Sequence, residues 1–76
     1  MKVLIQDTKS GQFLAPNNGW TNNPMEAENF GFSLTAHSTA QVLNLENYQI
    51  LFYCTETHYH ILIHRSGEGQ PADQKV

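Results

Sequence analysis

The chain has few charged residues and almost no cysteine, and both shortages narrow the possible functions. Asp, Glu, Lys and Arg make up 14% of its 76 residues, and the net charge is −3. The four basic residues are scattered along the chain, so no basic cluster can neutralise phosphates. We therefore predict that the protein does not bind nucleic acid. The single cysteine, Cys54, cannot form an internal disulfide.

Long hydrophobic runs are also missing from the sequence. No apolar run approaches the roughly 20 residues that a membrane-spanning helix needs. The N-terminal sequence MKVLIQDTKS lacks the apolar stretch and cleavage site of a signal peptide. Together with the lone cysteine, these absences predict a cytoplasmic protein that does not associate with membranes.

The length of the chain limits it to one small domain. A chain of this size buries only about 60–65% of the surface that its unfolded form exposes. A large interior active-site cleft does not fit such a domain, whereas dimerisation would hide more apolar surface. We expect residues 1–65 to form a single domain. Residues 66–76 contain two glycines, one proline and little apolar surface, so we expect a disordered tail.

Two predicted β-hairpins flank a helical middle. The first comprises residues 3–5 and 12–15, and the second comprises residues 49–54 and 58–64. A turn at residues 16–19 allows a short further strand at Trp20, whose ring we expect in the core.

The middle of the chain carries two helix-start signals, at Asn23-Pro24 and at Ser33, with Gly31 as the stop between them. The predicted fold is α+β, with elements in the order ββααββ. It has a three- to four-stranded antiparallel sheet from two hairpins and the helical segment 24–43 packed on one face.

Residues 3–52 resemble small uncharacterised proteins of bacterial and phage type. The shared features are an opening strand, the Thr8–Gly11 turn, Phe13-Leu14, Gly19-Trp20-Thr21 and then a helix leading to a final β segment. Four single positions, Pro24, Ala27, Phe30 and Ser33, complete the likeness. The resemblance implies the same fold and a bacterial source, and it implies no activity. The histidine-rich strand departs from this pattern.

The second strand of the last hairpin carries His58, His60 and His64. Strand geometry places His58 and His60 about 7 Å apart on one face, where both rings can reach one ion. Cys54 and Glu56 can approach from across the turn, whereas His64 can join only through a bulge or a second chain. Imidazole, thiolate and carboxylate are zinc ligands, so zinc or another first-row metal is a candidate cofactor.

A partly exposed histidine on the polar face of an alternating strand is more often simply solvated. Strand alternation places Tyr59, Ile61 and Ile63 toward the helix and the three histidines with Leu62 on the opposite face. We therefore expect Tyr53, His60 and Leu62 to form a bare sheet surface that contacts another protein or a second copy. Three histidines on one face would charge together near about pH 6–6.5 and weaken such a dimer.

The sequence offers little support for catalysis. His37 follows Ser33 by one helical turn, but no oxyanion-hole pattern accompanies the pair. Cys54 lies in an apolar strand without a cationic neighbour, which is typical of an inert thiol. We therefore predict a non-enzymatic binding or interaction module that forms homodimers. The alternative is a metal-binding protein that uses His58 and His60.

Overall fold

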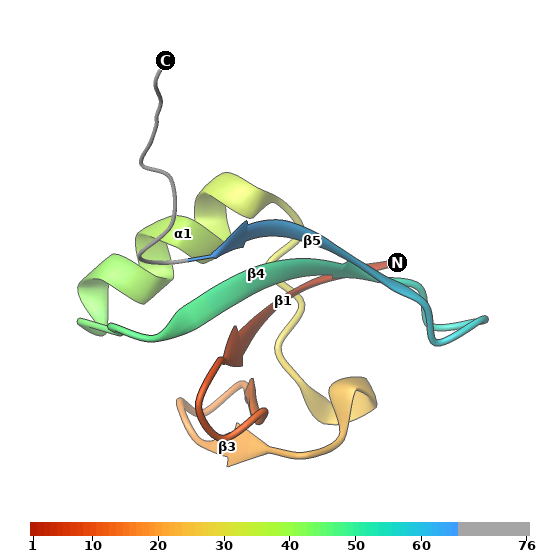
Figure 1. Ribbon diagram of the computed structural model, residues 1–76, viewed down its shortest axis with the longest axis horizontal. Coiled ribbons are helices and arrows are strands. Elements are labelled where there is room, and N and C mark those ends of the chain that lie inside the picture. The colour runs from red at the N-terminus through yellow and green to blue at the C-terminus, as the bar shows by residue number, and fades with distance from the viewer. Residues whose placement is uncertain (66–76) are drawn as a thin grey trace.

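The computed structural model describes residues 1–65, and their centre is a five-stranded antiparallel sheet in the order β3-β2-β1-β4-β5 (Figure 1). The predicted disordered tail at residues 66–76 lies outside the described residues. The elements are β1 (Lys2–Asp7), β2 (Phe13–Leu14), β3 (Trp20–Thr21), a 3-10 helix η1 (Pro24–Glu26), α1 (Ser33–Val42), β4 (Tyr48–Tyr53) and β5 (His60–Arg65).

The middle of the sheet is the pairing of β1 with β4. These strands run antiparallel over their whole length, with Leu4 opposite Leu51 and Ile5 opposite Ile50. Both strands are apolar on both faces, which is typical of strands covered on both sides. The α+β class is therefore confirmed. The predicted sheet of three or four strands is wrong in number, because Trp20–Thr21 forms a fifth strand against β2.

Helix α1 covers one face of this central pair. Ala36 and Ala40 are fully buried against it, because small side chains let the helix backbone approach the strands closely. The helix begins at Ser33, and Phe32 occupies the N-cap position without a side-chain cap bond. The core that α1 shares with the sheet comprises Val3, Ile5, Leu14, Ala36, Ala40, Tyr48 and Ile50.

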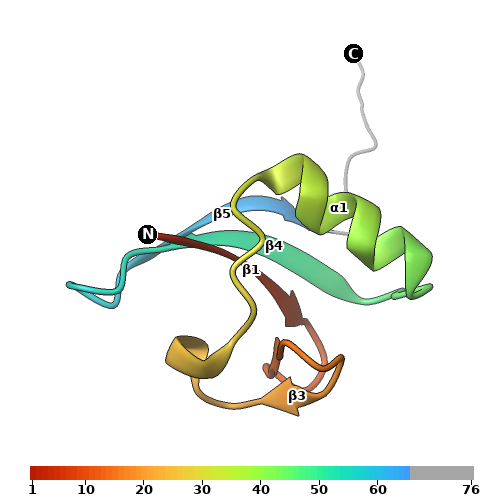
Figure 2. The same ribbon diagram turned by 180° about the vertical axis from the view of Figure 1, so that it is seen from behind.

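The segment before α1 covers the other face. η1 starts as the sequence predicts, with the Asn23 side chain accepting a hydrogen bond from the Met25 amide and Pro24 in the first turn. Ala27 then packs into a second cluster with Leu4 and Tyr53. The segment with β3 and η1 lies below the strands in both views, whereas α1 lies above them (Figures 1 and 2).

The prediction that residues 24–43 form one helical layer on one face of the sheet is therefore wrong. Residues 1–65 form one α-helix, and the turn of 3-10 helix before it lies on the opposite face of the sheet. Polar contacts fix this segment: the Lys2 ammonium donates to the carbonyls of Pro24 and Met25. Asn29 accepts from the Val3 amide, and the Phe30 amide donates to the Val3 carbonyl. Through these hydrogen bonds, residues 24–30 pair with the part of β1 near Lys2 and Val3, which β2 is too short to reach.

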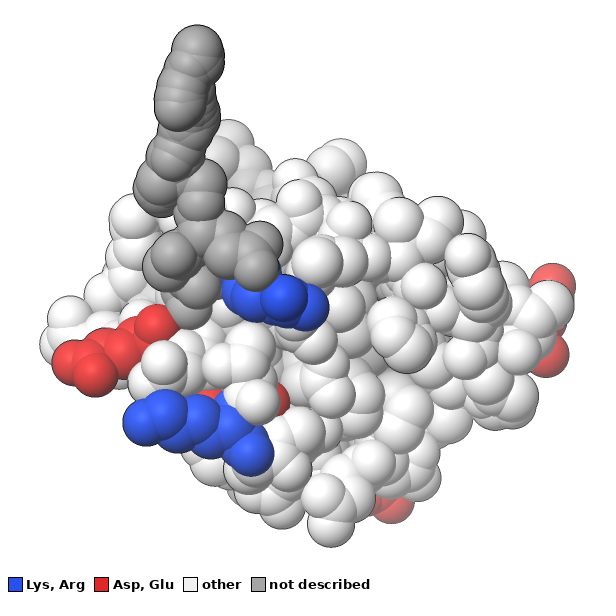
Figure 3. Space-filling view, viewed as in Figure 1, with Lys and Arg blue, Asp and Glu red and all other residues white. Residues whose placement is uncertain are grey.

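Trp20 lies at the far edge of the sheet and is 40% exposed, so its predicted place in the core is wrong. β3 has only two residues, and no further strand covers it among residues 1–65. No helix in this part of the chain has the length and apolar character needed to cross a membrane. On the face shown in Figure 3, the basic side chains lie close to acidic ones and most of the remaining surface is uncharged, so no basic cluster forms there.

Candidate interaction site along β5

β5 forms the free edge of the sheet beyond β4, and all six of its residues are exposed. Its apolar side chains and the preceding tyrosine keep between 36% (Ile63) and 66% (Tyr59) of their surface in contact with solvent. The strand is thus apolar in sequence without being covered. This combination is the main feature of the site.

A β-bulge at Ile63 changes which side chains share a face. His60, Ile61 and Leu62 lie opposite Tyr53, Phe52 and Leu51 in turn, and His64 lies opposite Ile50. The extra residue shifts the alternation, so His64 falls on the same side as Ile50, toward α1. The predicted grouping of His64 with His60 and Leu62 is therefore wrong, whereas Ile61 does face the helix side.

Four of the predicted metal-site residues, Cys54, Glu56, His58 and His60, lie in or beside the turn between β4 and β5. His58 adopts a left-handed backbone conformation (φ 61°), and its Nδ1 is 2.6 Å from the Tyr53 hydroxyl. The His58 ring lies beside the Tyr53 ring, with centroids 6.0 Å apart, and His60 lies opposite Tyr53 in the ladder. Within residues 1–65, no three His, Cys, Asp or Glu side chains come close enough to hold a metal ion. Cys54, Glu56 and His64 are therefore not gathered around His58 and His60.

The predicted interaction surface of Tyr53, His60 and Leu62 is only partly accessible. His60 and Leu62 are exposed, but Tyr53 is 4% exposed and belongs to the core cluster with Ala27. The prediction of a bare sheet face is wrong, because residues 13–27 cover that face at the central strands. The exposed surface is the β5 strand itself.

A groove of about 300 Å³ separates β5 from α1. Ser33, Leu34 and His37 line its helix side, Ile63 and His64 line its strand side, and Ile50 also contributes to the lining. Sequence reasoning paired Ser33 with His37 by their helical spacing but gave no sign that β5 would face them. The bulge at Ile63 turns His64 toward the helix, and no residue pattern in the sequence marks a bulge at this position.

His37, Tyr48 and His64 form a cluster beside the groove. The two imidazoles meet edge to face with ring centroids 5.2 Å apart. The Tyr48 hydroxyl is 3.3 Å from Nδ1 of His37, and the Gln41 amide nitrogen is 3.2 Å from Nε2. These contacts hold the His37 ring in one orientation.

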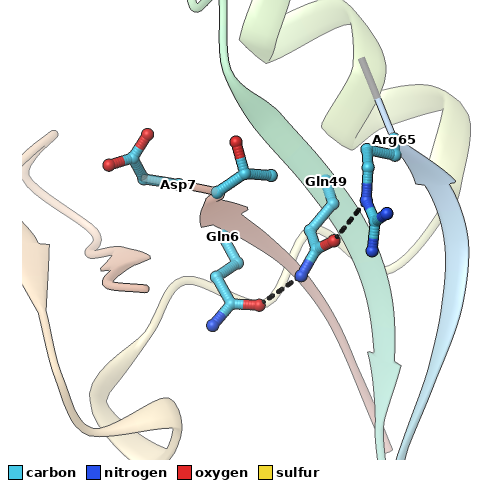
Figure 4. Close-up of a pocket in the computed structure, with 5 residues that line it drawn as sticks. Gln6, Asp7, Gln49 and Arg65 are labelled. Atoms are coloured by element: carbon cyan, nitrogen blue, oxygen red, sulfur yellow. Dashed lines mark hydrogen bonds between the residues drawn. The ribbon is translucent and has the colours of Figure 1, made fainter. Parts of the chain in front are cut away.

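A second, polar depression of about 310 Å³ lies where β1 ends and β4 begins (Figure 4). The Arg65 guanidinium Nε donates to the Gln49 side chain (3.0 Å), which donates to Gln6 (2.6 Å). Gln6 in turn donates to the Gly11 carbonyl. The Asp7 carboxylate points away from this row (Figure 4). The row connects three strands and a turn, which is a structural role.

Hydrogen bonds in two turns lower the pKa of a titratable side chain. The side chain and backbone of Ser10 hydrogen-bond the Asp7 carboxylate and lower its pKa. In the turn after β4, the Thr57 side chain hydrogen-bonds the Cys54 sulfur and lowers the pKa of the thiol. Cys54 is partly exposed. Within residues 1–65 it belongs to no cluster of three His, Cys, Asp or Glu side chains that could hold a metal ion.

Comparisons of the chain with family models, with curated proteins and with solved structures find no significant match. The resemblance to bacterial and phage-type proteins therefore stays a prediction. The function has to be argued from the surfaces described above.

Proposed function

We propose that the protein is a small, non-enzymatic binding module that self-associates through β5. The observation that carries the proposal is the exposure of this strand along its whole length despite its apolar sequence. An edge strand offers unpaired N–H and C=O groups to a second strand, and natural edges are usually protected by lysine, proline, bulges or shortness. β5 has the bulge at Ile63 but no lysine or proline. Regular pairing is therefore expected at His60–Leu62, before the bulge.

The distribution of charge supports a second copy as the partner. α1 and residues 57–64 contain no Asp, Glu, Lys or Arg, although the chain as a whole has a net charge of −3. Two copies repel each other over most of their surface, and the β5 side is where they can meet without opposing formal charges. A strongly charged partner would find no complementary charge there. A reducing, cytoplasmic setting belongs to this proposal, because the single cysteine has no internal partner.

Metal binding at His58 and His60 is the second candidate. One observation favours it: the Tyr53 hydroxyl holds Nδ1 of His58 and leaves Nε2 for an ion, which is how bound histidines are commonly oriented. Zinc or another first-row metal would need further ligands from water or from a second chain.

Sedimentation equilibrium over a concentration series at pH 7.5, together with native mass spectrometry, tests both candidates. We expect a dimer in the unmodified protein and at least about a tenfold higher dissociation constant, or about 1.4 kcal/mol, for Leu62→Lys. Val42→Lys is the matched control, because it adds the same charge at an exposed aliphatic residue on α1, and it should leave the constant unchanged. A monomer at every concentration contradicts self-association. Bound metal that is lost with EDTA and with His60→Ala would favour the second candidate.

A further inference from the structure

We propose that two copies pair through β5 in one register, with the two-fold axis at Ile61. The inference rests on the proposed self-association and deepens it, because it states which residues of the two strands lie opposite each other. Two properties of the edge carry it. One is the direction of the backbone groups along β5, and the other is the short stretch of regular strand between the turn and the bulge.

Alternate residues of β5 direct their backbone N–H and C=O groups to the free edge. The Cys54 amide donates to the Tyr59 carbonyl (2.8 Å), so these two residues occupy a hydrogen-bonded position of the ladder. Hydrogen-bonded and non-hydrogen-bonded positions alternate along an antiparallel pair. Two residues further on, Ile61 therefore bonds to β4 as well. His60 and Leu62 point the other way, to the free edge of the sheet.

The contacts on the other side of β4 give the same assignment. The Val3 amide donates to the Asn29 side chain, and the Val3 carbonyl accepts from the Phe30 amide, so the backbone of Val3 points away from β4. Val3 lies opposite Phe52, which therefore directs its own backbone groups toward β5. Phe52 lies opposite Ile61, so these two residues form a hydrogen-bonded pair. The direction of the groups on β5 thus follows from two independent sets of contacts.

Regular strand is short on both sides of Ile61. His58 has a φ of 61°, outside the extended range, and the bulge at Ile63 follows Leu62. Within residues 1–65 no strand pairs with this edge, which offers the N–H and C=O groups of His60 and Leu62. An antiparallel second copy uses all four groups only when His60 of each copy lies opposite Leu62 of the other. Ile61 then lies opposite Ile61 of the second copy, at the two-fold axis.

This register brings exposed side chains together on both faces of the joined sheet. Ile61 is exposed on the helix side and meets its equivalent at a non-hydrogen-bonded position, where opposing side chains come closest. On the other face, Leu62 lies beside His60 of the second copy, and such cross-strand pairs stabilise a sheet. The groove between α1 and β5 lies outside the paired stretch, because its strand side begins at Ile63.

Disulfide cross-linking in a Cys54→Ser background tests the register. Opposing residues at a non-hydrogen-bonded position have Cα atoms about 4.5 Å apart, within the range that a disulfide bridges. The two copies of Leu62 are offset by two residues and lie about 8 Å apart, beyond that range. With oxidised glutathione, Ile61→Cys should therefore form a covalent dimer at least about tenfold faster than Leu62→Cys, the control at a similarly exposed residue.

Sedimentation equilibrium of the reduced variants verifies that each still forms the dimer at the concentration used. Faster cross-linking of Leu62→Cys or of His60→Cys overturns the register and leaves self-association standing. The same conclusion follows if Ile61→Cys does not cross-link in a sample that sediments as a dimer. If the unmodified protein is monomeric at every concentration, both proposals fail.

Amide hydrogen exchange tests the register without a substitution at the interface. The Ile61 amide is the internal reference, because it bonds to β4 in the monomer as well as in the dimer. The amides of His60 and Leu62 should exchange at least about tenfold more slowly in the dimer than in the diluted monomer. Unchanged exchange at these two amides in a dimeric sample overturns the register.

Discussion

The ladder of β1 with β4 and the ladder of β4 with β5 contain similar apolar residues, but they differ in burial. The apolar residues of β1 are buried, whereas those of β5 are exposed. Leu51 and Leu62 lie opposite each other in neighbouring strands, yet Leu51 is 2% exposed and Leu62 is 43% exposed. The composition of a strand therefore does not decide its burial. What decides it is how far the covering segments reach across the sheet.

The reach of the covering layers follows from their dimensions. An α-helix with its side chains is about 10 Å wide, and neighbouring strands are about 4.8 Å apart, so one helix covers about two strands. α1 packs on β1 and β4 through Ala36 and Ala40. On the other face, Ala27 packs against Leu4 and Tyr53, which belong to the same two strands. Both layers cover mainly β1 and β4, and His37 of α1 meets only His64 near the end of β5. Within residues 1–65, the rest of β5 pairs with the sheet and remains exposed.

The largest expected effect is a difference in the free energy of unfolding between substitutions at Leu51 and Leu62, which face each other across two strands. Leu51→Ala should lower the free energy of unfolding by about 2–5 kcal/mol, because it leaves a cavity in a closed core. Leu62→Ala should cost about 1 kcal/mol or less, because water already reaches its side chain. Urea denaturation measures both values, at a protein concentration low enough to keep the chain monomeric. Equal losses would show that β5 is covered in the monomer.

A smaller effect on the free energy of unfolding is expected at the turn that follows β1. Asp7 closes the turn after β1, where its carboxylate accepts from the Ser10 amide at 2.9 Å. Because the folded pKa of Asp7 lies below its unfolded value of about 3.9, its contribution is present above that value. The contribution is lost as the pH falls through the folded pKa.

We expect Asp7→Ala to cost about 0.5–1 kcal/mol near neutral pH, in the lower range for hydrogen bonds because the group is partly exposed. Urea denaturation of variant and unmodified protein should give converging values as the pH falls below the folded pKa. Asp7→Asn serves as the control, because it keeps an acceptor and removes the charge. A difference that persists unchanged in acid would disprove this role.

The smallest effect is expected at the turn attached to β5. Thr57→Val removes the hydroxyl that hydrogen-bonds Cys54, so the pKa of the thiol should rise. The pH dependence of alkylation by iodoacetamide reports this shift. Thr55→Val is the control, because Thr55 lies in the same turn and does not perturb Cys54. Stability should change by less than about 0.5 kcal/mol, and an unaltered alkylation profile would contradict the assignment.

Local signals in the sequence predicted the elements well. The turn at Thr8–Gly11, the helix starts at Asn23-Pro24 and Ser33, and the apolar strand near residues 49–54 all form, with shifts of about one residue at the ends. Each depends on side chains close together in the chain. The pairing of β1 with β4 and the layer formed by Ala27 depend on residues far apart, which periodicity cannot show.

The candidate site was predictable only in part. The unusual composition of residues 58–64 drew attention to a strand that is exposed in the structure, and His60 and Leu62 are exposed as expected. The meeting of His64 with His37 was missed, because a one-residue bulge reverses the side on which every later residue lies. Tyr53 was placed on the surface for a similar reason, since nothing in its own strand reveals that Ala27 covers it.

The pairing of β1 with β4 also sets the order in which the domain can assemble during synthesis. β1 is translated early, but its partner strand is made only after β2, β3, η1 and α1. Until then, Val3, Leu4 and Ile5 have no central neighbour, and the helix has no complete surface to pack on. Such distant pairing slows folding and leaves apolar segments open to other chains in the meantime. A nascent chain that stops before Tyr48 therefore lacks the strand that completes its core.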